Sequence, residues 1–130
     1  MTRKEITVAF YPCNFVRPEW QYDLTPERFT AFFSALAEEL HPFGVLLKSC
    51  QDPAVTIDVR GYGDVLNAVR LRSPQDGVCN LCLGHVIGVS PNRDLLEDIR
   101  RGVNRLVFAP ETVEPEGSNK VVCHNCGCGC

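Results

Sequence analysis

Six of the eight cysteines in this 130-residue chain fall into two short segments whose spacing suits metal binding. The upstream segment is a C-x-x-C pair, and the last eight residues hold the other four thiols. A C-x-x-C pair can bring two thiolates onto one metal ion when a tight turn separates the two residues. Two such pairs supply the four sulfurs of a tetrahedral site, so the sequence predicts a metal–thiolate centre. The expected metal ligands are Cys79, Cys82, Cys123, Cys126, Cys128 and Cys130.

The second pair, Cys123 and Cys126, is followed directly by Gly127 and has the form of a zinc knuckle. In a knuckle, backbone N–H groups after the first cysteine point at its sulfur, and glycine accepts the left-handed turn. The upstream pair fits this form less well, because Leu83 stands where the glycine usually is. Together the two pairs resemble the opposed knuckles of zinc ribbons and rubredoxin-type iron sites. The resemblance covers only these two stretches and implies that four sulfurs coordinate zinc or iron.

The alternating end of the chain, Cys-Gly-Cys-Gly-Cys, provides two thiols, Cys128 and Cys130, that one zinc site does not require. The glycines leave the backbone free, so neighbouring thiolates can wrap a cluster or bridge two soft ions. This favours an iron–sulfur cluster, or a relay for a soft ion such as Cu(I). The simpler alternative is a tail whose extra thiols bind nothing.

Cys13 and Cys50 each stand at the C-terminal end of a predicted strand. If these strands are parallel neighbours, both thiols lie on the rim where open α/β sheets bind ligands. We therefore treat the two residues as candidate cofactor-binding residues, which could complete a four-cysteine site with the upstream pair and without the tail. We also expect the two thiols to face each other. The alternative is that both are small buried apolar residues, which is the usual role of a free cysteine.

The elements that must position these cysteines follow an α+β pattern. The expected order of elements is strand, helix, strand, strand, helix, strand. This order indicates a small open sheet with two helices on one face. The first crossover should be a right-handed parallel βαβ unit. A ferredoxin-like arrangement and a truncated thioredoxin-like one both fit, and residues 65–72 suit either a short helix or a strand. The expected strands are residues 5–11, 45–50, 54–59 and 105–109, and the expected helices open at Pro26 and Pro91.

Composition divides the chain into a body and a tail. Residues 1–109 read as one α+β domain, which is an ordinary size for a chain with its own core. Residues 110–120 hold two prolines and three glutamates and read as a linker. Residues 121–130 then form the cysteine-rich tail, which we expect to pack back on the domain and bind metal there.

Charge and hydropathy exclude several functions. Hydrophobic residues make up 45% of the chain, charged residues 22%, and the net charge is −3. No basic cluster is present, so the sequence does not favour nucleic-acid binding. No apolar run approaches the ~20 residues that cross a membrane, and the first residues do not form a signal peptide. We therefore expect a cytoplasmic protein without membrane insertion, whose reduced thiols serve metal or redox chemistry rather than disulfides.

These observations predict a small metal–thiolate protein that binds an iron–sulfur cluster or zinc. We expect it to act in electron transfer or as an accessory subunit of a redox or metal enzyme, with a protein partner. The alternatives are a zinc-stapled structural or interaction domain and a metallochaperone-like relay of a soft ion. We expect no catalysis by this chain alone. A dithiol oxidoreductase is the minor alternative, because the residues after Cys82 look like a poor helix start.

Overall fold

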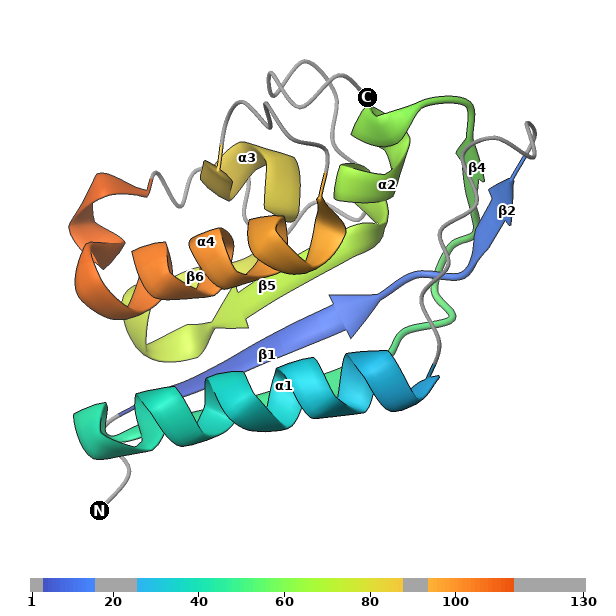
Figure 1. Cartoon of the computed structure of the whole chain (residues 1–130). Coiled ribbons are helices and arrows are strands. Elements are labelled where there is room, and N and C mark those ends of the chain that lie inside the picture. Colours follow the sequence, from blue (N-terminus) through green and yellow to red (C-terminus); the bar gives the residue numbers. More distant parts are fainter. Residues whose placement is uncertain (1–3, 16–25, 88–93, 114–130) are drawn as a thin grey trace.

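The computed structural model describes residues 4–15, 26–87 and 94–113, which form a mixed α+β body (Figure 1). Four strands make the main sheet in the order β3-β1-β5-β6, and two short strands, β2 and β4, pair in a second sheet. The strands are β1 (Lys4–Phe10), β2 (Cys13–Phe15), β3 (Val45–Gln51), β4 (Ile57–Val59), β5 (Val69–Ser73) and β6 (Val78–Cys82). The helices are α1 (Pro26–Leu40), α2 (Tyr62–Ala68), α3 (Leu83–Ile87) and α4 (Leu95–Phe108).

The predicted βαβ unit is confirmed. β1 and β3 are parallel neighbours, with Ile6 opposite Leu47, and α1 lies between them in the chain. β5 then runs antiparallel to β1, and β6 runs antiparallel to β5. The sequence allowed two arrangements, and the strand order of the described residues corresponds to the thioredoxin-like one. A ferredoxin-like fold would need a further strand after the second long helix.

The strand predicted at residues 105–109 is wrong, because α4 continues to Phe108. Ile99, Val103 and Leu106 recur at helical spacing, and all three are fully buried. Their packing outweighs the local strand preference of the valine and phenylalanine that follow. The helix begins at Leu95, with Asp94 as its N-cap, and not at Pro91 as predicted. Pro91 itself lies outside the described residues.

α1 forms where the sequence predicts it. Pro26 occupies the first helical position, where its missing N–H removes no hydrogen bond. Leu36 and Leu40 are buried, and the three phenylalanines of the helix pack partly buried against the same core. The helix ends at Leu40, and a 3₁₀ turn follows that closes on Gly44 with a φ of 76°. That left-handed conformation suits glycine and stops the helix there.

α1 and α4 lie on the same face of the sheet, as predicted (Figure 1). Arg100 of α4 joins the two helices, because its Nη1 is 2.6 Å from Glu39 Oε2 and its guanidinium lies over the Phe32 ring. The core between helices and sheet contains Ile6, Val8, Leu36, Leu71, Ile99, Val103 and Leu106, each fully buried.

Two other predicted segments differ in detail. The sequence pattern of residues 65–72 allowed a helix or a strand, and the segment contains both. α2 ends at Ala68, and β5 begins at Val69. The strand predicted at residues 54–59 is shorter, and it pairs with β2 instead of joining the main sheet. Val113, which falls within the expected linker, is buried in the core. The rest of the linker and the cysteine-rich tail lie outside the described residues.

Candidate functional site

Cys82 is the upstream thiol whose surroundings are best defined. It ends β6 and is fully buried. Its Sγ accepts a hydrogen bond from the backbone N–H of His85 at 3.3 Å. Such N–H donors are what sulfur ligands receive in metal sites, where they orient the sulfur and balance its charge.

The helix that follows Cys82 was not expected. α3 begins at Leu83, so the prediction of a poor helix start there is wrong. The cause is tertiary packing, because Leu83 and Val86 are buried and α3 lies against α4 at Gly102. A Cβ on Gly102 would lie 2.6 Å from Leu83 Cδ1, so any larger residue there would require the buried Leu83 side chain to shift.

The backbone between Cys79 and Cys82 is extended, not turned. Both residues belong to β6. Val78 pairs with Ser73 and Leu81 pairs with Leu71, so β6 advances three residues where β5 advances two. This extra residue is a β-bulge, a feature that often redirects a strand beside functional sites. The tight turn predicted for this C-x-x-C pair is therefore absent. Three residues of a strand span about 9–10 Å, whereas a disulfide requires Cα atoms within about 7 Å. Closing one here would require the strand to move.

Strand register places Cys50 and Cys82 on one row across the sheet. Cys50 on β3 is opposite Ala9, Ala9 is opposite Arg70, and Arg70 is opposite Cys82 on the far edge. Three strand spacings separate the first and last residue, which is about 14 Å. Metal–sulfur bonds of about 2.3 Å cannot bridge that gap. A four-cysteine site that joins Cys50 to Cys82 without the tail is therefore excluded in this structure.

Cys13 and Cys50 occupy the predicted rim but are not register partners. β1 and β3 are parallel as expected, yet Cys13 lies beyond the end of β1 and pairs with Ile57 in the second sheet. Cys13 is half-buried, its thiol donates to the Tyr11 carbonyl at 3.6 Å, and burial raises the pKa of the Cys13 thiol. Cys50 is exposed. Whether either residue contributes to a cofactor site stays a prediction.

A polar network around Arg70 joins β5 and β6, and the sequence did not indicate it. Arg70 is fully buried, stacks over the Tyr11 ring at 5.2 Å, and donates to Asn67 Oδ1 at 2.5 Å. Asn80 donates to the Tyr11 hydroxyl and accepts from Arg72. The alternation Val-Arg-Leu-Arg of β5 does predict that both arginines share one face, but their burial depends on partners far away in the chain. The network holds Arg70, the residue that is in cross-strand register with Cys82.

Arg72 extends this network to the surface. Its Nη2 is 2.5 Å from Asp52 Oδ2, and the backbone N–H of Ala54 donates to Asp52 Oδ1. The Arg72 hydrogen bond, together with that backbone donor, holds the pKa of Asp52 below its usual value. This pair connects the turn after β3 to the central strand β5.

Within residues 4–15, 26–87 and 94–113, no three histidine, cysteine, aspartate or glutamate side chains gather closely enough to hold a metal ion. The tail cysteines Cys123, Cys126, Cys128 and Cys130 lie outside these ranges. The centre that they were predicted to share with the upstream pair therefore stays a prediction.

No family model, curated protein or solved structure matches this chain. In the part of the chain that the structure describes, no helix is long and apolar enough to cross a membrane.

Proposed function

We propose that this chain is a cytoplasmic metal–thiolate protein that binds an iron–sulfur cluster or zinc and serves a protein partner in electron transfer or as an accessory subunit. The observation that carries the proposal is the concentration of six cysteines in two segments of a chain with otherwise ordinary composition. Four thiolates suffice for a tetrahedral zinc or iron site. The remaining two suit a cluster better than a single zinc ion.

The surroundings of Cys82 support this assignment. Its sulfur receives a backbone N–H, and the buried Arg70 stands beside it in strand register. A metal with four thiolates carries net negative charge, which a buried cation and backbone donors offset. Among the described strands, β6 lies at an edge of the four-stranded sheet, so a second segment of chain can approach β6 from outside.

The well-formed core bears on the alternative of a zinc-stapled domain. The described body buries 23 hydrophobic residues in one cluster. Domains that need zinc to fold are usually those too small to form such a core. A metal held as cargo or cofactor therefore fits better than a metal held as a staple. A soft-ion relay remains the second candidate, because it too needs a folded body with accessible thiols.

Anaerobic purification followed by elemental analysis and a visible spectrum tests the proposal. An iron–sulfur protein absorbs visible light, whereas zinc and Cu(I) proteins are colourless. A protein that carries none of these metals, and takes up none when reconstituted, would contradict the proposal. A chelator should remove the metal without unfolding the body, and unfolding on chelation would instead favour the zinc staple.

Three variants assign the ligands. Cys82→Ser should reduce the metal content, whereas Cys50→Ser should retain it, because Cys50 lies about three strand spacings away. Truncation after Gly127 removes Cys128 and Cys130 and should lower the metal content or change the spectrum. An unchanged truncated protein would show that the last two thiols are not ligands.

A further inference from the structure

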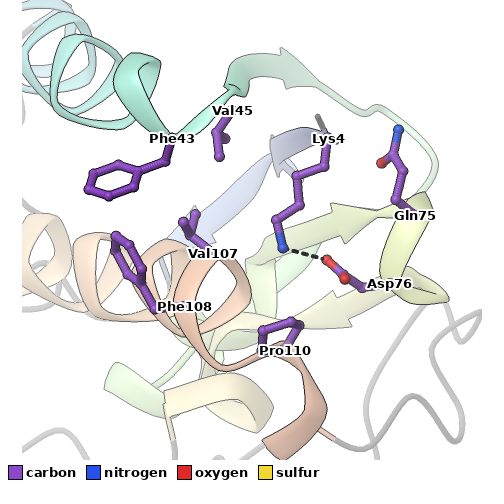
Figure 2. A pocket seen from close by; sticks show the side chains of 8 residues that line it. All are labelled: Lys4, Phe43, Val45, Gln75, Asp76, Val107, Phe108 and Pro110. Atoms are coloured by element: carbon purple, nitrogen blue, oxygen red, sulfur yellow. Dashed lines mark hydrogen bonds and ion pairs between the residues drawn. The ribbon is translucent and has the colours of Figure 1, made fainter. Parts of the chain in front are cut away.

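Two of the most exposed hydrophobic side chains of the described body lie together at one end of the sheet. Phe43 is 48% exposed and Phe108 is 56% exposed. Their rings meet edge to face with centroids 5.0 Å apart, and Figure 2 shows them side by side. Because this contact orders both rings against each other, a partner that binds them loses little conformational entropy in ordering them.

Phe108 stands between two hollows in the surface. The first has a volume of about 330 Å³ and includes Phe43, Val45, Val107 and Pro110 in its wall (Figure 2). The second has a volume of about 440 Å³. Its wall combines Val86, Ile87 and Ala109 with Arg101, Asn104 and Arg105. Adjacent hollows divided by a ridge are the form in which surfaces receive successive side chains of an extended peptide.

The two hollows differ in charge. In the first, Lys4 Nζ lies 2.9 Å from Asp76 Oδ2, so its cation is neutralised. In the second, Arg105 donates to the Val86 carbonyl and to the Thr112 carbonyl and hydroxyl, and these partners within the described residues are all uncharged. Arg101 is paired with Asp98 at 3.2 Å. The rim of the second hollow therefore carries excess positive charge, which complements a carboxylate.

We propose that this surface binds an extended segment of a partner protein that carries two apolar side chains two positions apart and a carboxylate beside one of them. The apolar side chains enter the hollows on either side of Phe108, since alternate residues of a strand point the same way about 7 Å apart. The carboxylate lies against the rim of Arg101 and Arg105. The first hollow lies near Lys4 at the start of β1, whereas Cys50 and Cys82 lie level with Ala9. The second hollow is lined in part by Val86 and Ile87 of α3, the helix that follows Cys82.

Fluorescence polarisation with two labelled peptides tests the proposal on the full-length protein. Both peptides carry leucine and phenylalanine two positions apart, and glutamates flank them in one peptide and lysines in the other. We expect the glutamate peptide to bind at least tenfold more tightly than the lysine peptide, and we expect its affinity to fall when the salt concentration is raised. Equal affinity for both peptides, or binding of neither, overturns the proposal.

Two matched variants locate the binding. Phe108→Ser should weaken binding of the glutamate peptide at least tenfold, while Leu46→Ser should leave it unchanged. Leu46 is 42% exposed but stands on the opposite face of the sheet from Val45, so it controls for the loss of an exposed apolar side chain. Circular dichroism checks that both variants fold. Equal effects of the two substitutions would refute the location. Self-association that Phe108→Ser abolishes would assign the surface to a second copy of this chain and overturn the proposed partner.

Discussion

Replacing Gly102 with alanine should destabilise the protein even though alanine is the better helix former. An ideal Cβ at this position lies 2.6 Å from Leu83 Cδ1 and 2.9 Å from Leu71 Cδ1. Carbon atoms in contact prefer about 3.5–4.0 Å, so both leucines must move by roughly 0.6–1 Å. Both are fully buried, and one belongs to α3 while the other belongs to β5.

Two opposing effects set the size of the change. Alanine in place of glycine within a helix contributes about 0.8–1.0 kcal/mol. Forcing one extra methyl group into a packed core costs about 1–3 kcal/mol. Since two buried side chains from different elements must yield here, we expect the upper part of that range. The free energy of unfolding should therefore fall by about 1–2 kcal/mol in the Gly102→Ala protein.

Urea denaturation followed by circular dichroism measures this difference. Gly61→Ala is the matched control, because its added Cβ meets nothing within 4 Å and its φ of −166° is ordinary extended backbone. Because Gly61 is the N-cap of α2, where alanine is less favourable than glycine, this substitution should cost no more than about 0.5–1 kcal/mol. In a Leu83→Ala background, Gly102→Ala should be less destabilising, which a double-mutant cycle detects. Equal or higher stability of Gly102→Ala in the native background would refute the close approach of α3 and α4.

Two further predictions concern ionisable groups. The pKa of Asp52 is lowered in the folded protein, so its carboxylate stabilises the fold above the unfolded pKa of about 3.9 and this contribution is lost on acidification. Asp52→Asn should therefore be less stable than the native chain at pH 7, and denaturation from pH 7 to 3 should show the difference narrowing below about pH 4. Alkylation at pH 8 with peptide mass spectrometry should modify exposed Cys50 first, then Cys13, whose pKa burial raises, and Cys82 last. Modification of Cys82 before Cys50 would contradict its burial.

Elements that depend on local signals could be predicted from the sequence. The sequence predicts α1 because a cap, a proline and an apolar face coincide. It predicts β1 and β3 because short apolar runs lie between turn residues. The β5–β6 hairpin was missed although a signal exists. Asp76-Gly77 is a strong hairpin dipeptide, and Gly77 adopts a φ of 76° between the two strands. The C-x-x-C spacing predicts a turn in the segment that the hairpin makes into a strand.

The remaining errors arise from long-range packing. α3 is only five residues long and would not be stable alone, so it forms because Leu83 and Val86 are buried against the rest of the body. The burial of Arg70 depends on Tyr11 and Asn80, which are far from it in the chain or on another strand. No local pattern contains this information, because an arginine that alternates with apolar residues ordinarily faces solvent.

The C-x-x-C spacing itself illustrates why a motif needs its backbone. Two cysteines three residues apart chelate one ion only when the chain turns between them, since the turn sets their distance. In β6 the same spacing is stretched along a paired strand, and the hydrogen-bonded partner β5 holds it there. If Cys79 and Cys82 do bind one ion together, part of β6 must leave β5, and metal binding would then be coupled to opening of this edge of the sheet. If only Cys82 is a ligand, the strand stays paired and the tail supplies the other sulfurs. Amide hydrogen exchange of Leu81, a β6 residue paired with Leu71, distinguishes the two cases, because exchange should accelerate with metal in the first and slow or remain unchanged in the second.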